Sequence, residues 1–254
     1  MRDFQLMEQD ATSHVPERAL AVFAHCDDIE FGACGTVARW VAAGAQVTYC
    51  IVTDSGAGGN DPGIDLEKLK QTRRQEQIDA ADAVGVQDVR FFEGYQDGTL
   101  QPTMALRKQI TALIRETRPD TVVTFDPETV FSADRGYVNH PDHRAVAEAT
   151  LYAVFPSAGS RPIFADLLDE GLEPHDVMWL YMTLTNHPDL HVDITDVIER
   201  KTAALRCHAS QYGDDVVQMV VGWNKEAGEQ VGTGYAESFR TLKLRDGAPD
   251  QEAE

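Results

Sequence analysis

The chain has 254 residues, of which 43% are hydrophobic and 25% are charged, so it is long enough and apolar enough to bury one core. This is the composition of a globular protein, which disfavours disorder, collagen and coiled coil. The formal net charge of −20 repels phosphate backbones and anionic lipids, which argues against nucleic acid or a membrane as partner. Because no signal peptide, membrane span or CxxC pair is present in the sequence, we expect a cytoplasmic protein with reduced thiols.

The first half of the chain alternates between two kinds of pattern. Short apolar or β-branched runs predict strands, whereas longer runs with helical spacing predict helices between them. Gly85 marks the end of one helix, and the Arg118-Pro119 step ends another, because a residue before proline resists the α conformation. The strands are expected at about 19–24, 46–53, 88–92 and 121–127, and the helices at 31–44, 66–84 and 104–117.

The second half continues the alternation after a polar loop at 128–139. A helix is predicted over 140–155 and a strand over 176–183. Residues 191–211 begin extended and turn helical near Thr195 or Asp196, either of which is a suitable N-cap. The tail at 212–244 is rich in glycine and gives no clear element.

This order of elements predicts an α/β fold of the Rossmann-like, three-layer α/β/α type, with a mostly parallel sheet. We expect one domain over residues 19–244, a flexible arm at 1–18 and a disordered tail at 245–254. In such folds ligands bind outside the carboxyl ends of the strands. The residues that follow Phe23, Thr53, Phe92 and Phe125 should therefore surround one crevice.

Two clusters of imidazole and carboxylate groups stand where this crevice is expected. His25-Cys26-Asp27-Asp28 follows the first strand directly, and His140-Pro141-Asp142-His143 opens the helix after the fourth strand and its loop. Either cluster alone is a weak signal in so acidic a chain. Their joint placement at two strand ends favours a metal or catalytic site.

A catalytic zinc ion is typically held by three His or carboxylate ligands and a water. His25 and Asp28 are three residues apart, so one turn can direct both side chains inward, and either His140 or His143 completes the set. Asp27 and the remaining histidine stay unligated. These are the groups that hydrolysis needs: a carboxylate that takes a proton from water, and a histidine that stabilises the oxyanion or protonates the leaving amine.

Several motifs in the chain resemble the PIG-L/LmbE-like family of zinc-dependent N-acetylglucosamine de-N-acetylases. The family motif AHPDDxE stands here as Ala24–Glu30 with Cys26 in place of the proline, and its HPDH motif is intact at 140–143. Weaker matches cover most of the rest of residues 19–240. They are Thr53-Asp54-Ser55-Gly56 (the TDG-type turn), Arg73–Glu76 with Gly85-Val86, Lys201–Leu205 with Ser210-Gln211, and Tyr235–Phe239.

The resemblance implies an LmbE-like deacetylase domain that removes an N-acyl group, most simply acetyl, from an amino sugar or glucosaminyl conjugate. It implies one zinc ion per chain, held by His25, Asp28 and His143, with Asp27 as the general base. The catalytic and binding roles implied for other residues are His140 as the acid or oxyanion stabiliser, Asp142 as its orienting partner and Arg73 as a substrate contact. The implied partner is a small amino-sugar substrate, and a homo-oligomer is compatible with the family.

Two other functions use the same residues. A non-catalytic sugar- or metal-binding member of the fold is one, because fold does not determine function and Cys26 departs from the motif. A non-haem iron oxygenase with two histidines and one carboxylate is the other. Asp27 and His140 have no clear role in either.

Overall fold

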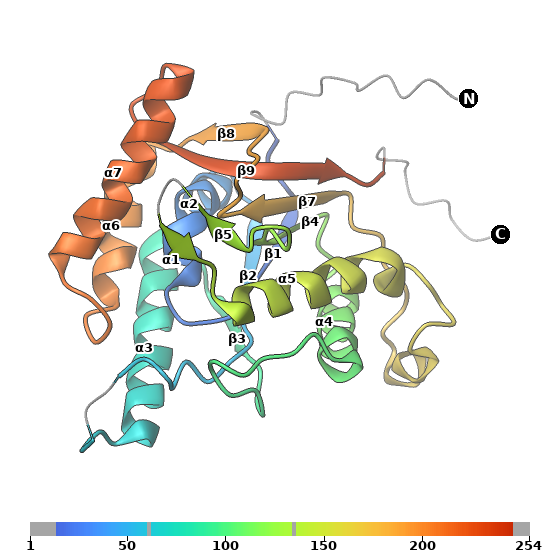
Figure 1. The fold of residues 1–254 in the computed structure, drawn as a ribbon. Coiled ribbons are helices and arrows are strands. Elements are labelled where there is room, and N and C mark those ends of the chain that lie inside the picture. The colour runs from blue at the N-terminus through green and yellow to red at the C-terminus, as the bar shows by residue number, and fades with distance from the viewer. Residues whose placement is uncertain (1–13, 60–61, 134–135, 246–254) are drawn as a thin grey trace.

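The structure is a computed structural model that describes residues 14–59, 62–133 and 136–245. Over these residues, one sheet of seven strands has the order β3-β2-β1-β4-β7-β9-β8, and a small antiparallel hairpin, β5-β6, stands apart from it (Figure 1). The strands are β1 Arg18–Phe23, β2 Gln46–Ile51, β3 Asp88–Phe91, β4 Thr121–Phe125, β5 Phe131–Ser132, β6 Tyr137–Val138, β7 Trp179–Thr183, β8 Leu190–Asp193 and β9 Ala236–Lys243.

Helices cover both faces of the sheet, and α4 and α5 lie on the opposite side from α2, α3 and α6 (Figure 1). The helices are α1 Asp28–Gly32, α2 Cys34–Ala42, α3 Leu66–Val84, α4 Met104–Thr117, α5 Pro141–Tyr152, α6 Ile198–Cys207 and α7 Asp214–Val231. Short helical segments are η2 Ala153–Ala158, η3 Ala165–Glu170 and η4 Thr195–Val197. The predicted three-layer α/β fold is confirmed.

Strand β1 lies inside the sheet between β2 and β4, and both pairings are parallel, with Ala19 beside Val47 of β2 and Thr121 of β4. Its sequence is a continuous apolar run because helices cover both faces of a parallel sheet. Phe23 and Phe125 close the carboxyl ends of β1 and β4, with ring centroids 4.8 Å apart. The strand order reverses between these two strands, and this switch point is where ligands bind in such sheets.

Two predictions about elements need correction. The helix predicted over 31–44 is two helices, since the chain breaks at Ala33 (φ −146°, ψ −13°) and α1 already begins at Asp28. The tail at 212–244 contains the long helix α7 and strand β9, which pairs antiparallel with both β7 and β8.

The predicted arm and tail lie almost wholly outside the described residues; of the two, only residues 14–18 and Arg245 are described. Arg18 already belongs to β1. Across the described ranges, no helix is both long and apolar enough to cross a membrane.

Candidate active site

The first cluster forms a tight turn between β1 and α1. Asp27 adopts a left-handed conformation (φ 109°), which Asp tolerates better than most residues with a side chain. Asp28 begins α1, and its Oδ2 accepts a hydrogen bond from the His25 backbone N–H at 2.7 Å. The turn therefore brings His25 and Asp28 to the same side of the loop, as their spacing predicts.

The second cluster forms the N-terminus of α5. His140 is the N-cap, and its Nδ1 accepts the backbone N–H of Asp142 at 3.3 Å, while Pro141 occupies the first turn, where its missing N–H costs nothing. His143 points toward the sheet, and its ring stacks on Phe125 with centroids 4.0 Å apart. The helix thus delivers His143 to the carboxyl end of β4.

The Asp28 carboxylate joins the two clusters. Its Oδ2 lies 3.3 Å from His25 Nδ1, and its Oδ1 lies 3.0 Å from His143 Nε2. Burial alone would raise the pKa of Asp28, but the two imidazoles outweigh it and hold the pKa far below its usual range. Two imidazoles and a carboxylate that contact one another are the ligand types of a catalytic zinc site, so the chemistry of these residues fits such an ion.

The outer nitrogen of each of these histidines is also fixed. His25 Nε2 lies 3.1 Å from Asp97 Oδ1 and 3.2 Å from Asp142 Oδ2, and His143 Nδ1 lies 3.0 Å from Asn139 Oδ1. Burial opposes the charged form of His25, but the surrounding carboxylates raise its pKa well above the ordinary value. Metal-binding histidines are commonly oriented in this way through the ring nitrogen that faces away from the metal.

Sequence reasoning missed Asp97 and Asn139. Asp97 lies after β3, where the strand-end rule predicts crevice residues, so its position was a usable signal. Asn139 carried no signal, because its contact with His143 exists only once α5 has formed.

The carboxylate of Asp142 does not have the predicted neighbour. It accepts backbone N–H groups from Gly98 (2.7 Å) and Leu100 (3.0 Å) and contacts His25, whereas its hydrogen bond to His140 comes from its backbone amide. In this structure Asp142 therefore orients His25. Its predicted role as the partner of His140 stays a prediction.

His140 lies at the edge of the site as a neutral group. Its ring centroid is 4.7 Å from that of His25, and burial together with His25 lowers its pKa. Because its Nδ1 accepts the Asp142 amide, the ring proton is on Nε2. His140 can therefore donate a hydrogen bond without carrying a charge. One ring nitrogen of His140 also lies within 4.8 Å of a ring nitrogen of His25 and of His143. By distance, His140 is therefore a further possible metal ligand.

Asp27 lines a pocket of about 550 Å³ together with Asp28 and His143. Burial and the adjacent Asp28 carboxylate raise the pKa of Asp27 to about 8. A carboxylate with a pKa near neutrality is suited to taking up and releasing a proton. Trp223 and Met219 of α7 also line the pocket, and they belong to the tail for which the sequence predicted no element.

A buried network of polar side chains supports the turn at Asp27. The backbone N–H of Asp27 donates to Gln77 Oε1 at 2.9 Å, and Gln77 Nε2 donates to both oxygens of Glu30 at 3.1 and 3.2 Å. His208 Nε2 lies 3.1 Å from Glu30 Oε2, and Gln211 Nε2 donates to the Cys26 carbonyl at 2.7 Å. Helix α3 and the end of α6 thereby hold the catalytic turn in place.

This network predicts a pH-dependent stability. Burial lowers the pKa of His208, but the hydrogen bond and charge of Glu30 outweigh it and raise the pKa above 6.5. The folded state therefore binds this proton more tightly than the unfolded chain. The stabilisation is complete below pH 6.5 and is lost as the pH rises through the folded pKa. Urea unfolding at several pH values should show this loss in the wild type and not in His208→Gln. Equal pH slopes in both proteins would contradict the assignment.

Arg73 lies on α3, and its guanidinium is occupied by the protein itself. It is 5% exposed and donates to the carbonyl oxygens of Ser55 and Gly58. Its contacts in this structure hold the loop after β2, and its predicted contact with substrate stays a prediction.

Comparisons with known proteins agree with the hydrolytic chemistry that the site geometry suggests. Residues 20–154 match the PIG-L family, described as GlcNAc-PI de-N-acetylase. Diacetylchitobiose deacetylase of Thermococcus kodakarensis is 30% identical over 232 residues, which cover 88% of this chain and 82% of that protein. A probable N-acetyl-α-D-glucosaminyl L-malate deacetylase 2 of Bacillus anthracis is 28% identical over 206 residues, with 79% and 84% covered.

A solved structure extends the likeness to three dimensions. N,N′-diacetylchitobiose deacetylase from Pyrococcus horikoshii, in complex with an inhibitor, superposes with a TM-score of 0.82 at 29% identity. The match covers 90% of this chain and 84% of that chain. The family match spans more than half of the sequence, and both clusters lie within it. The chain therefore belongs to the PIG-L family, and the predicted enzyme class, a deacetylase that hydrolyses an amide, is confirmed.

Proposed function

We propose that this protein is a zinc-dependent N-deacetylase that removes the acetyl group from an N-acetylglucosamine unit of a small conjugate. The observation that carries the proposal is the position of Asp28 between His25 and His143, with Asp27 and His140 beside them and outside that set. The relatives named as deacetylases of diacetylchitobiose and of a glucosaminyl malate support the choice of substrate class.

His25 Nδ1, Asp28 and His143 Nε2 would hold the ion. A bound zinc ion supplies Lewis acidity and lowers the pKa of a coordinated water. Asp27 takes the proton of the attacking water and passes it toward the departing amine. His140 donates through Nε2 to the oxygen on which negative charge develops.

The pocket fits a sugar ring with an attached group. Phe31 and Trp223 give it aromatic surface, and Asn139, Asn186 and Ser132 add polar groups. Apolar walls with a few polar groups are typical of small-ligand sites. The acetamide of the substrate would point toward Asp27 at the inner end.

Metal removal tests the proposal. Stoichiometric zinc is expected in the purified protein, with amine release from N-acetylglucosaminyl conjugates that a chelator stops and added zinc restores. Zinc binding to the folded state should also raise the melting temperature, since a ligand that binds only the native state stabilises it. Iron with oxygen uptake would favour an oxygenase instead. Zinc and sugar binding without amine release would favour a non-catalytic member of the fold.

A further inference from the structure

One hydrogen bond links the metal-binding turn to the loop after β2. The backbone N–H of Cys26 donates to Ser55 Oγ at 2.9 Å, and both residues are buried, with 1% exposure each. Cys26 lies between a predicted metal ligand and the predicted general base. A change in the direction of its amide therefore turns His25 and Asp27 together.

Ser55 itself is held from several sides. Its backbone N–H donates to Thr53 Oγ1 at 3.3 Å, and its carbonyl accepts the Arg73 guanidinium. It has a positive φ of 51°, a conformation that usually selects glycine. A serine that is kept in this conformation and buried needs a compensating contact, and the Cys26 amide supplies one.

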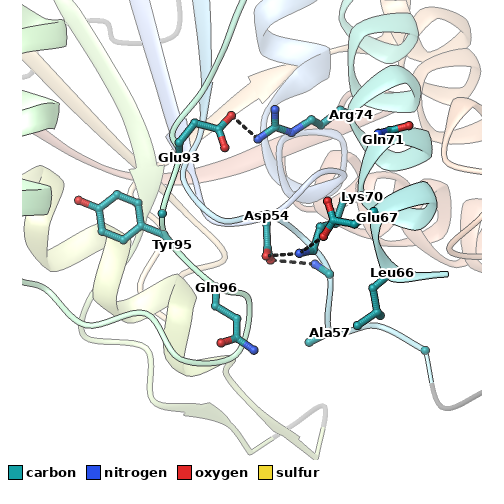
Figure 2. A pocket seen from close by; sticks show the side chains of 13 residues that line it. Asp54, Ala57, Leu66, Glu67, Lys70, Gln71, Arg74, Glu93, Tyr95 and Gln96 are labelled. Atoms are coloured by element: carbon teal, nitrogen blue, oxygen red, sulfur yellow. Dashed lines mark hydrogen bonds and ion pairs between the residues drawn. The ribbon is translucent and has the colours of Figure 1, made fainter. Parts of the chain in front are cut away.

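The residue before Ser55 fixes the loop to its surroundings (Figure 2). Asp54 Oδ1 accepts the backbone N–H of Gly56 at 3.1 Å and of Asp97 at 3.0 Å, and Asp54 Oδ2 lies 3.0 Å from Lys70 Nζ. Asp54 and Lys70 line a second pocket, between the loop after β2, the start of α3 and the loop after β3. Figure 2 shows their side chains pointing toward one another. Ser55 therefore has a fixed position, and its hydroxyl can hold the neighbouring turn at residues 25–28 by a hydrogen bond.

The contact also excludes a proline at position 26. The Cδ of a proline takes the place of the amide hydrogen, and that hydrogen points at Ser55 Oγ. A proline would therefore collide with the serine hydroxyl, whereas a glycine at position 55 would leave room for it. Position 26 is where the sequence departs from the motif AHPDDxE, and Ser55 belongs to the TDG-type turn, so this departure is physically linked to the second motif.

We propose that Ser55 is a positioning residue, whose hydroxyl holds the turn at residues 25–28 through the Cys26 amide in place of the rigidity of a proline. The pairing is a property of this chain and acts on the reaction through His25 and Asp27. Its effect on metal binding rests on the proposed function, but its effect on folding does not.

A double-mutant cycle between positions 26 and 55 tests the pairing. Cys26→Pro should weaken zinc binding by about 10- to 100-fold, the range found when groups that orient metal ligands are lost. Ser55→Gly removes the acceptor and should weaken it in the same direction. The double variant has neither the collision nor the unpaired amide, so it should bind zinc more tightly than Cys26→Pro and should not show the product of the two losses.

Two further variants keep the test decisive if Cys26→Pro does not fold. Ser55→Ala retains the side-chain Cβ and loses only the acceptor, and it should bind zinc about tenfold more weakly than the wild type. Cys26→Ala keeps the amide and its hydrogen bond, so it should bind zinc about tenfold more tightly than Ser55→Ala. Cys50→Ala, on the neighbouring strand β2, is the control for loss of a buried thiol.

Zinc affinity is measured by competition with a chromophoric chelator, and the cycle is repeated as urea unfolding of metal-free protein. Additive losses in both measurements, or an unchanged zinc affinity in Ser55→Ala, would overturn the pairing. Absence of zinc binding in the wild type would instead count against the proposed function, while the unfolding cycle would still decide whether the pair exists.

Discussion

Replacing Asp27 by asparagine is expected to lower kcat by about 10²- to 10⁴-fold, the usual contribution of a general base. The amide cannot accept the proton of the attacking water, yet it has nearly the same size. Asparagine also tolerates the positive φ of this position as well as aspartate does. The turn, its hydrogen bond to Gln77 and the adjacent ligands should therefore remain in place.

The decisive measurement combines steady-state kinetics with metal analysis of the same preparation. The variant should retain stoichiometric zinc and an unchanged melting temperature while kcat falls. Asp120→Asn is a matched control, since Asp120 precedes β4 at the amino ends of the parallel strands, away from the site, and accepts backbone N–H groups from residues 17 and 18. Full activity in Asp27→Asn would rule out Asp27 as the base.

Replacing Lys201 by methionine is expected to lower the free energy of unfolding by about 3–5 kcal/mol, the range found when one partner of a buried ion pair is removed. Lys201 on α6 and Glu237 on β9 are essentially unexposed, and their Nζ and Oε1 atoms lie 2.6 Å apart. Lys201 also donates to the carbonyl of Phe31 at 3.2 Å. Its loss would leave the Glu237 carboxylate buried without a cation.

Glu237 has further contacts that make this charge structural. Its two oxygens accept the backbone N–H groups of Gly35 at 2.9 Å and Thr36 at 2.7 Å, at the start of α2. A carboxylate at a helix N-terminus satisfies unpaired N–H groups and interacts favourably with the helix dipole. A Cβ at Gly35 would lie 2.9 Å from Ile194 Cδ1 and 3.0 Å from Glu237 Oε1, so the position requires glycine.

Urea unfolding measures the effect directly, and the midpoint should shift without a change in slope. The double variant Lys201→Met/Glu237→Gln should be less destabilised than the single one, because neither position then holds an unpaired buried charge. Lys108→Met removes an exposed ion pair with Asp166 and should change stability by at most about 1 kcal/mol. A similarly small loss in Lys201→Met would contradict the role of the pair.

Local pattern was sufficient to predict the parallel half of the fold. The strands at β1, β2 and β4 are buried on both faces and read as apolar runs, and α3 and α4 end at the expected residues. The break at Ala33 was not predictable from the local sequence. After the break, Glu237 accepts the N–H groups of Gly35 and Thr36 in the first turn of α2 from about 200 residues away.

The tail escaped prediction for a related reason. Only Val217, Val220, Asn224 and Gly228 of α7 are buried, so its apolar face is narrow, and β9 places the charged Glu237 on a buried face. Neither segment follows its usual pattern. The tertiary partner of each exists only in the folded chain.

In the candidate site, too, some features could be predicted from local sequence and others depend on tertiary contacts. The spacing of His25 and Asp28 and the strand-end rule located the crevice, and the family resemblance selected His143 over His140. The strand-end rule could have placed Asp97 in the crevice, but its contact with His25, and that of Asn139 with His143, are seen only in the structure.

The position of β9 has a consequence for how the protein is made. This strand is the last element of the described residues, yet it lies between β7 and β8 and bonds to both. Until β9 has been synthesised, β7 presents an open edge, and such edges invite pairing with other chains. A nascent chain that stops before Ala236 also lacks Glu237, and with it the anchor for α2. A chain that is synthesised from its N-terminus therefore completes this sheet only after β9 has emerged, long after its central parallel strands, and until then it needs protection from pairing with other chains.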